Sequence, residues 1–269
     1  MSRGSKLVRV QREDGYAVVL RDNPPVNALT LEMTREFHAV LEELATDRGV
    51  RAVVITAEGN RSFGAGSDIT EFGSFIDRGD VVERKMAFEN ETFSMLCSLP
   101  VPTIAALNGS AFGGGLEIAL ACDLIVAEHG QVVGLPEVKL GLLPGSGGPV
   151  RMARRIGEAR TKELIYLGDP ISVEAALDWG LINKVVEPGQ AIGWARDWAA
   201  RLAGSSATGL RACKAAIHAA LQHDIGEASI RQSLELTRAV FAHPDAAEGM
   251  SAFLAKRPPA FPSATFADG

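Results

Sequence analysis

Apolar and polar positions alternate in two different periods along the first part of the chain. Residues 7–21 form two apolar runs that meet at Asp14-Gly15, a dipeptide typical of tight hairpin turns. After Thr30, a suitable N-cap, apolar residues recur at helical spacing to about Thr46. Residues 51–57 are a continuous apolar run, as in a buried strand. The pattern therefore predicts a hairpin, a helix and a buried strand.

The same kinds of segment recur further on. A glycine-rich loop over 58–69 precedes a helical stretch from about Asp80 to Cys97, whose apolar stripe includes Met86 and Phe93. Four shorter segments follow: a strand at 103–109, a helix at 113–123, and strands at 124–128 and 131–134. The repeated order of strand, strand and helix predicts an α/β fold built from layered units.

Helical patterns dominate from about residue 147 to 254, with a short strand predicted at 182–187. A helix over 172–180 has Ser172 as its N-cap and Gly180 as its stop signal. Further helices are predicted at 189–202, 207–221 and 226–241, and the proline-rich end, 257–269, is expected to be extended or disordered. We therefore divide the chain into a core at 1–200 and a C-terminal helical region at 201–269.

Composition places the chain among ordinary globular proteins. Of its 269 residues, 46% are hydrophobic and 22% are charged, which allows a sizeable core. The net charge of −6 argues against a general nucleic-acid-binding protein. No apolar run approaches the roughly 20 residues that span a bilayer, and the N-terminus lacks the features of a secretory signal. We expect a cytoplasmic protein with no membrane or nucleic-acid partner.

Several types of site are disfavoured by spacing. The three cysteines contain no CxxC pair, and the five histidines form no HxH or HxxxH, so neither a disulfide frame nor a metal site is predicted. The glycine-rich segments match neither phosphate-binding pattern, and "PGSGG" at 144–148 lacks the spacing of a serine-hydrolase elbow.

Two glycine-containing turns are candidates for an oxyanion hole. A helix that begins at Gly114 or Gly115 leaves its first amides unpaired, with the positive end of the helix dipole behind them. The turn at Ala65, Gly66 and Ser67 can present a second free N–H. Two amides that converge on one oxygen stabilise an enolate or a tetrahedral oxyanion. Plain turn and packing roles for these glycines remain open.

Two acids lie among apolar residues. Glu117 falls in the first turn of the predicted helix, and Glu137 follows Pro136 between apolar runs. A buried carboxyl has a raised pKa, which suits proton exchange near neutral pH. Glu117 could instead favour the helix N-terminus, and Glu137 could be a surface loop residue.

Six ordered segments resemble the enoyl-CoA hydratase/isomerase family, also called the crotonase superfamily. They are "NPPVNALT" (23–30), "FGAGSDITEF" (63–72), "PTIAALNGSAFGGGLEIALACDLIVA" (102–127), "GLPEVKLGLLPGSGG" (134–148), "GDPISVEAALDWGLINKVV" (168–186) and "EGMSAFLAKRPPAF" (248–261). The resemblance implies a crotonase-like spiral of repeated β-β-α units with a C-terminal helical region that builds homotrimers, commonly paired into hexamers.

The resemblance also implies a coenzyme A thioester as the ligand, with no separate cofactor or metal. The oxyanion donors would be the amides of Ser67 and Gly114. The stretch that contains Ala65, Asp68, Ile69 and Thr70 would line the path of the CoA moiety, and Lys256 resembles a C-terminal lysine that can reach a CoA site.

Both glutamates of the hydratase pattern are present. Glu117 matches the residue that deprotonates water for attack at the β-carbon, and Glu137 matches the one that protonates the α-carbon. The reaction implied is reversible syn addition of water to a trans-2-enoyl-CoA. The alternatives are a Δ3-Δ2 enoyl-CoA isomerase, another acyl-CoA lyase, decarboxylase or dehalogenase of this superfamily, and a non-catalytic CoA- or RNA-binding relative. Three departures from the family's frequent residues, Ser67, Leu135 and Pro149, bear mainly on acyl specificity.

Overall fold

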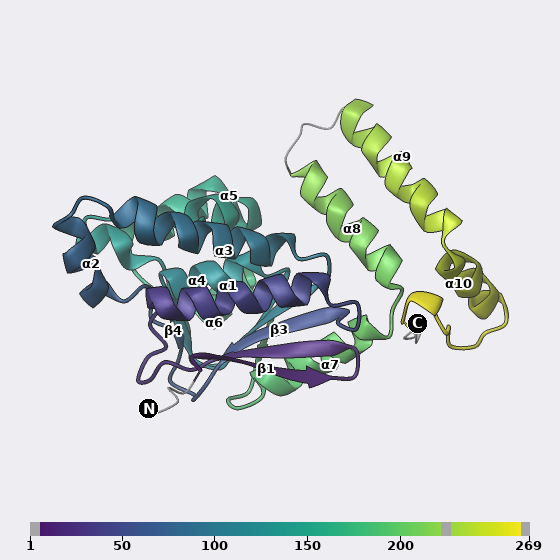
Figure 1. Ribbon diagram of the computed structural model, residues 1–269, viewed down its shortest axis with the longest axis horizontal. Helices are drawn as coiled ribbons and strands as arrows, with labels where there is room; N and C mark the ends of the chain where they lie inside the picture. The colour runs from purple at the N-terminus through teal and green to yellow at the C-terminus, as the bar shows by residue number, and fades with distance from the viewer. Residues whose placement is uncertain (1–5, 222–226, 265–269) are drawn as a thin grey trace.

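The computed structural model describes residues 6–221 and 227–264, and its core contains two β-sheets (Figure 1). The larger sheet has the strand order β1-β2-β3-β5-β7-β10, and the smaller has the order β4-β6-β8-β9. The strands of the larger sheet are β1 (Val8–Glu13), β2 (Tyr16–Arg21), β3 (Ala52–Ala57), β5 (Thr103–Leu107), β7 (Leu124–Glu128) and β10 (Lys184–Val186). Those of the smaller sheet are β4 (Ser62–Gly64), β6 (Ser110–Phe112), β8 (Val132–Gly134) and β9 (Ile171–Ser172).

Successive strand pairs divide themselves between the two sheets. In each of three repeats, the first strand (β3, β5, β7) joins the larger sheet and the second (β4, β6, β8) joins the smaller sheet, with parallel pairing inside each set. A helical segment follows each pair. The chain therefore advances as a spiral of β-β-α units, which confirms the predicted strand, strand, helix order.

Alternate residues of the central strands enter two different cores because side chains alternate across a strand. Val53 and Ile55 of β3 belong to the core that includes Phe37 of helix α1 (Leu31–Thr46). Val54 belongs to the core on the other face, which contains Ala195 of helix α7 (Ala191–Ala203). Burial on both faces explains why these strands are continuous apolar runs.

The helices cover this frame on both sides. They are α1 (Leu31–Thr46), α2 (Ile69–Ile76), α3 (Ala87–Ser98), α4 (Gly114–Ala121), α5 (Gly148–Leu167), α6 (Val173–Asp178), α7 (Ala191–Ala203), α8 (Ala207–Ala220), α9 (Glu227–Ala242) and α10 (Pro244–Leu254). Shorter helical segments are η1 (Val82–Met86, a π-helix), η2 (Pro136–Leu140) and η3 (Pro262–Ala264).

Turn and capping residues in the sequence predicted several boundaries of strands and helices correctly. Strands β1 and β2 pair as the predicted hairpin around Asp14-Gly15. Thr30 caps α1 by accepting from Met33 N at 3.1 Å, and Ser172 caps α6 by accepting from Ala175 N at 3.1 Å. Helix α2 was not predicted. The single helix expected from Asp80 to Cys97 consists of a short π-helix, η1, followed directly by α3. The expected extended end contains η3, while residues 265–269 lie outside the described residues.

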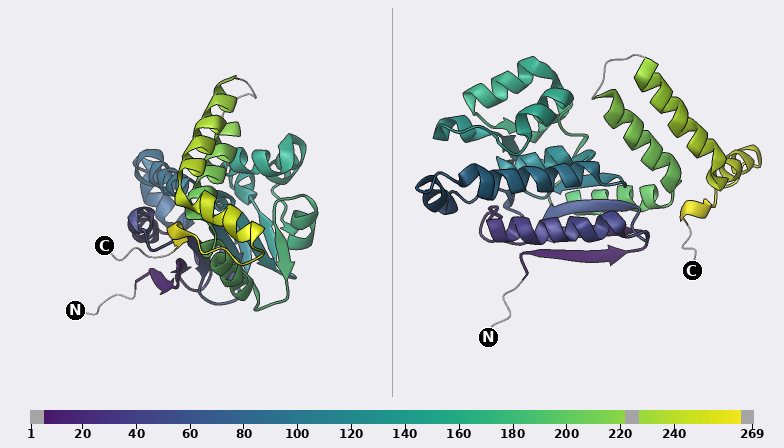
Figure 2. Two further views of the ribbon diagram at one scale, coloured as in Figure 1. Left: turned by 90° about the vertical axis from the view of Figure 1, so that its right-hand side faces the viewer. Right: turned by 45° about the horizontal axis from the view of Figure 1, so that its top comes forward.

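The last three helices stand away from the layered body, as Figures 1 and 2 show. Helix α8 packs beside α9, and α10 packs against α9 and η3. Helix α7 ends at Ala203, three residues beyond the boundary that we predict from the sequence. Among the residues described, no helix combines the length and apolar character needed to cross a membrane.

Candidate active site

Three parallel strands of the smaller sheet end at one edge, and each leads into a predicted site segment. The Ser67 turn follows β4, the Gly113-Gly114 turn follows β6, and η2 with Glu137 follows β8. Because β4, β6 and β8 are parallel neighbours, their carboxyl ends lie side by side. Segments that are far apart in sequence therefore meet at one place, as ligand-binding loops do in other parallel sheets.

The Ser67 turn presents its amide toward the start of α4. Leu29 N donates to Gly66 O at 2.8 Å and Asp68 N donates to Leu29 O at 2.9 Å, so the N–H of Ser67, between them, faces away from Leu29. A Cβ built on Gly114 would lie 3.7 Å from Ser67 N, and one built on Gly66 would lie 3.6 Å from Gly114 N. Gly66 has φ +97°, which favours glycine. The two predicted donors are therefore neighbours.

Helix α4 packs closely against β4 because the contact is made at a glycine, Gly115. A Cβ on Gly115 would lie 2.3 Å from the carbonyl oxygen of Gly64, a distance that no side chain tolerates. The first amide of α4, that of Gly114, has no partner inside the helix because it precedes the first helical hydrogen bond. Gly115 thus sets how closely this amide approaches the Ser67 turn.

Glu117 is held at the beginning of α5. Its side chain is buried, and its Oε1 atom accepts hydrogen bonds from Ser146 N at 2.9 Å and Gly148 N at 2.8 Å. Burial raises the pKa of Glu117 to about 7, the charges of Glu137 and Glu89 add to the rise, and the two amides oppose it. The amide donors and the helix dipole stabilise the ionised form in this position.

Glu137 lies in a different environment. Its Oε2 atom is shielded from solvent and has no hydrogen-bond partner among the described residues. Its other carboxyl oxygen lies beside Gly113, where a Cβ would come within 2.9 Å of Oε1. Burial raises the pKa of Glu137. The charge of Glu137 also raises the pKa of Glu117, after the larger effect of burial.

The stretch expected to line the CoA path lies on the surface next to these groups. Ala65, Ile69 and Thr70 are exposed, with Ile69 61% exposed. Asp68 immediately precedes α2, and its Oδ1 atom accepts from Thr70 N at 2.9 Å and from Thr70 Oγ1 at 2.7 Å. These hydrogen bonds lower the pKa of Asp68. The carboxylate of Asp68 is thus engaged in capping α2.

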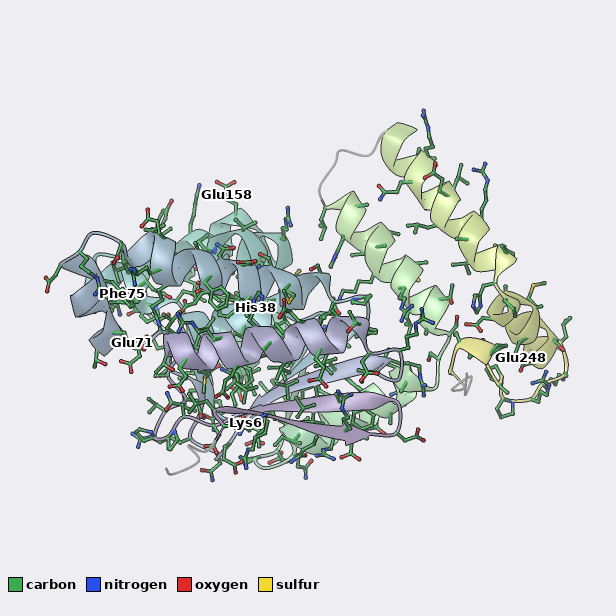
Figure 3. The ribbon with its side chains drawn as sticks, viewed as in Figure 1. Lys6, His38, Glu71, Phe75, Glu158 and Glu248 are labelled. Atoms are coloured by element: carbon green, nitrogen blue, oxygen red, sulfur yellow. The ribbon has the colours of Figure 1, made fainter. Side chains whose placement is uncertain are left out.

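Lys256 is not brought to the other predicted site residues within one chain, as far as the described segments show. It follows α10, which packs against α9 and η3. Figure 3 places Glu248 of α10 and Glu71 of α2 at opposite ends of the molecule.

Reasoning from the sequence missed a third buried acid, Glu89 of α3. Glu89 is fully buried, and both its carboxyl oxygens accept from Ser67 Oγ at 2.9 Å. It also accepts from Ser146 Oγ at 3.2 Å and pairs with buried Lys85 at 3.4 Å. The signal was present, because position 89 falls between Met86 and Phe93 on the predicted apolar stripe.

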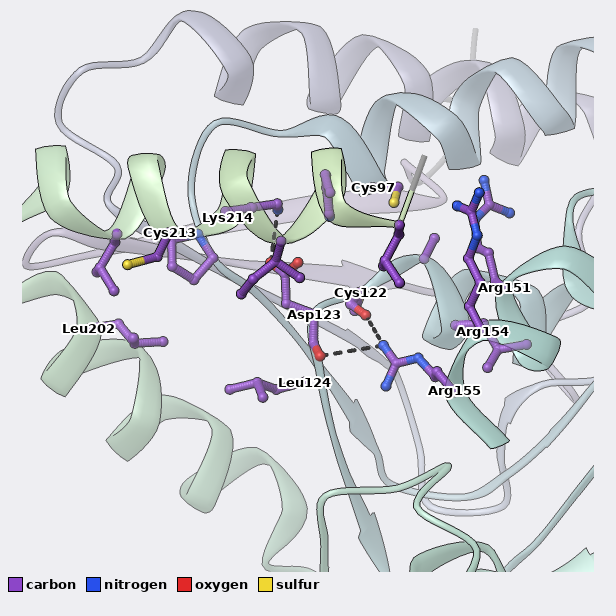
Figure 4. A pocket seen from close by; sticks show the side chains of 17 residues that line it. Cys97, Cys122, Asp123, Leu124, Arg151, Arg154, Arg155, Leu202, Cys213 and Lys214 are labelled. Carbon is purple, nitrogen blue, oxygen red and sulfur yellow. Dashed lines mark hydrogen bonds and ion pairs between the residues drawn. The ribbon is translucent and has the colours of Figure 1, made fainter. Parts of the chain in front are cut away.

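A separate cavity of about 520 Å³ lies between α8 and the body of the molecule (Figure 4). Its walls are largely apolar. Among its polar groups, Arg155 donates to the carbonyl oxygens of Cys122 and Asp123, and Lys214 pairs with Asp123 at 2.8 Å. None of the predicted site residues lines this cavity. Within the described part of the chain, no three His, Cys, Asp or Glu side chains are grouped as metal ligands.

Comparison with known proteins gives a consistent result. Residues 11–264 match the family model described as enoyl-CoA hydratase/isomerase. A short-chain-enoyl-CoA hydratase of Clostridium acetobutylicum is 36% identical over 252 residues, which cover 93% of this chain and 95% of the relative. A crotonyl-CoA hydratase of Syntrophomonas wolfei is 34% identical over 251 residues, covering 92% and 95% of the two chains. The crystal structure of an enoyl-CoA hydratase from Bacillus anthracis superposes with a TM-score of 0.91 at 31% identity, covering 96% of this chain and 99% of that one.

Proposed function

This chain belongs to the enoyl-CoA hydratase/isomerase family and is an enzyme of the hydratase type, and from that premise we propose that it adds water reversibly, in syn fashion, to a trans-2-enoyl-CoA. One observation carries the proposal. Glu117, whose carboxyl is buried, and half-buried Glu137, whose Oε2 atom is shielded from solvent, lie at the strand ends where the amides of Ser67 and Gly114 are neighbours. This arrangement supplies a base, an acid and an oxyanion site together.

The amides of Ser67 and Gly114 are the proposed donors to the thioester oxygen. Charge moves onto this oxygen as the enolate forms, and donors fixed in advance stabilise it without reorganisation. The Gly114 amide is at the positive end of the α4 dipole, which adds to the effect. Removing one donor of this kind typically costs about 10²- to 10³-fold in rate.

Glu117 and Glu137 divide the proton transfers. Glu117, ionised and held by two amides, takes a proton from water while the water oxygen bonds to the β-carbon. The π electrons of the alkene shift into the bond between the α-carbon and the thioester carbon, and the π electrons of the carbonyl move onto its oxygen, which forms the enolate. As the carbonyl re-forms, the neutral carboxyl of Glu137 gives its proton to the α-carbon. Glu117 is now protonated and Glu137 is ionised, so a net transfer of one proton from Glu117 to Glu137 restores the starting state. The same steps in reverse eliminate water.

Replacing Glu137 by Gln tests this role directly. The amide keeps the size of the side chain but cannot deliver a proton, so we expect hydration of crotonyl-CoA to fall by roughly 10²- to 10⁴-fold. The Kd for butyryl-CoA, which cannot be hydrated, should stay within a few-fold of the wild type. Glu158→Gln, on the exposed side of α5, is the matched control. Wild-type turnover by Glu137→Gln would refute the assignment.

The isomerase alternative uses one carboxyl and no water. The buried, unpartnered Oε2 atom of Glu137 favours it as that single proton carrier. The two activities are distinguished by giving the wild-type enzyme a trans-3-enoyl-CoA and crotonyl-CoA in turn. Consumption of the first alone identifies an isomerase, whereas loss of the conjugated absorbance of the second identifies a hydratase.

The C-terminal helices support an assembly into homotrimers or dimers of trimers. Eight large apolar side chains on or beside α8, α9 and α10 are each at least 48% exposed in one chain: Ile217, Leu221, Ile230, Leu234, Phe241, Met250, Phe253 and Leu254. Burial of such a surface between copies would be favourable. Because Lys256 is remote from the site of its own chain, we propose that it contacts the CoA bound by a neighbouring copy.

A further inference from the structure

A fully buried ion pair lies behind the proposed active site. Lys85 of η1 and Glu89 of α3 have no exposed side-chain surface, and Lys85 Nζ lies 3.4 Å from Glu89 Oε1. Lys85 also donates to Glu71 Oε2 at 2.7 Å and to the carbonyl oxygen of Leu29 at 3.0 Å. Leu29 is the residue whose main chain holds the Ser67 turn. The pair is therefore anchored to the same turn as the proposed oxyanion donor.

Glu89 extends this anchoring to two loops through serine hydroxyls. Ser67 Oγ donates to the carboxylate with 2.9 Å to each oxygen, and Ser146 Oγ donates with 3.2 Å to Oε2. The two serines are 79 positions apart in sequence, on different elements. A single carboxylate thus joins the segment after β4 to the segment before α5.

Each serine carries a main-chain group that we assign to the reaction. The amide of Ser67 is a proposed donor to the thioester oxygen, and the amide of Ser146 donates to Glu117 Oε1 at 2.9 Å. A hydrogen bond that fixes either serine side chain also restricts the main chain of the same residue, including its amide. Glu89 therefore controls, through side chains, the relative position of an oxyanion donor and the catalytic base.

We propose that Glu89 is a positioning residue of this enzyme, whose buried carboxylate ties the Ser67 turn to the Ser146 loop and so aligns the thioester oxygen site with Glu117. It touches no reacting atom and acts through the two serines. The proposal rests on the hydratase function proposed above.

Stability alone does not account for this arrangement. Removing two charges from water costs several kcal/mol per ion, and apolar side chains of similar size often stabilise a core at least as well. Positioning does account for it, because a displacement of about 1 Å in a catalytic group can cost around 10²-fold in rate.

Three single variants test the link. Ser67→Ala and Ser146→Ala each cut one hydroxyl contact and leave the main-chain amide and the Lys85–Glu89 pair in place, while Glu89→Gln removes the charge. We expect kcat for crotonyl-CoA to fall about 10- to 100-fold with the Kd for butyryl-CoA changed less than threefold. Glu91→Gln, an exposed acid on the same helix, is the control and should match the wild type. Wild-type kcat in Ser67→Ala and Ser146→Ala overturns the proposal.

A double variant separates positioning from general loss of packing. If Glu89 acts through Ser67, adding Ser67→Ala to Glu89→Gln should lower kcat by less than a further twofold, since the link is already broken. If the fold-reductions in kcat of the two single variants multiply in the double variant, Glu89 and Ser67 act independently and the proposal is overturned. Should Glu89→Gln fail to fold, the two serine variants still decide the question.

A measurement without turnover separates this proposal from the proposed function. Butyryl-CoA labelled with ¹³C at the thioester carbon reports polarisation of its carbonyl through its infrared stretching frequency. Binding should lower this frequency in the wild type and lower it less in Ser67→Ala. A wild-type enzyme that shows the shift but does not hydrate crotonyl-CoA refutes the hydratase function and leaves the positioning role standing. An unchanged shift in Ser67→Ala overturns the positioning role.

Discussion

Glu117 makes the folded protein less stable whenever its carboxyl is ionised. The residue is buried, and its pKa of about 7 compares with about 4.3 in an unfolded chain. Because the folded pKa is the higher one, the contribution to stability is complete below about pH 4 and is lost as the pH rises to about 7. The loss of folding stability caused by Glu117, the proposed base, therefore depends on pH.

Glu117→Gln should remove this cost. The neutral amide can still accept the hydrogen bonds of Ser146 and Gly148, so the variant should match the wild type near pH 4 and exceed it by about 1 to 4 kcal/mol above pH 7. Urea unfolding at several pH values measures the difference. A difference that does not change with pH would show that ionisation of Glu117 is not its source.

The sequence predicted a buried site residue correctly where a single acidic residue lies among apolar ones. Glu117 was noticed as one acid in an apolar helix, and the structure shows that it is buried. Glu89 was missed although it lies on the predicted apolar stripe, because Lys85 and Glu89, four positions apart, have the spacing of an exposed helical ion pair. The structure shows that both side chains are buried.

At the scale of elements, the start of α4 depends on close contact with β4. From the sequence, the glycine triplet was predicted to present free amides to a ligand, and the structure shows in addition that the carbonyl of Gly64 packs against Gly115. The loop at 145–148 could not be assigned a role in advance, because its amides bind Glu117 across about 30 residues of sequence.

Two alanine substitutions in helices should therefore have opposite effects. Gly115→Ala places a Cβ 2.3 Å from Gly64 O, so we expect a loss of about 1 to 3 kcal/mol in unfolding free energy and a lower hydration rate. Gly193→Ala, in α7 with no atom within 4 Å of its Cβ, should gain about 0.5 to 1 kcal/mol at unchanged rate. Thermal unfolding and a crotonyl-CoA assay measure both. Equal effects would show that contact with Gly64 does not limit position 115.

For the whole molecule, the repeated strand order made the fold class predictable. The division of each strand pair between two sheets was not visible in the local pattern, since it depends on pairing between repeats. The boundary at 200/201 remains a prediction.

The exposed apolar side chains of α8–α10 lead to a prediction about assembly. Sedimentation equilibrium should give a mass of three or six times 28.5 kDa. Phe253→Asp, at a side chain that is 83% exposed, should shift the population toward smaller species because a charge is costly in an apolar contact. Glu235→Gln on α9 is the control. A monomeric wild-type protein would contradict the proposed trimer.

The proposed use of main-chain amides at Ser67 and Gly114 has a consequence for how readily this enzyme could acquire a new activity. Most mutations change a side chain and leave the main-chain N–H in place. Substitutions that preserve the two turns should therefore leave the proposed activation of the thioester unchanged. In the proposed mechanism, the choice of reaction depends instead on the two carboxyls at positions 117 and 137. Few substitutions, at or near these two carboxyls, would therefore be needed to change the reaction while the oxyanion site stays intact.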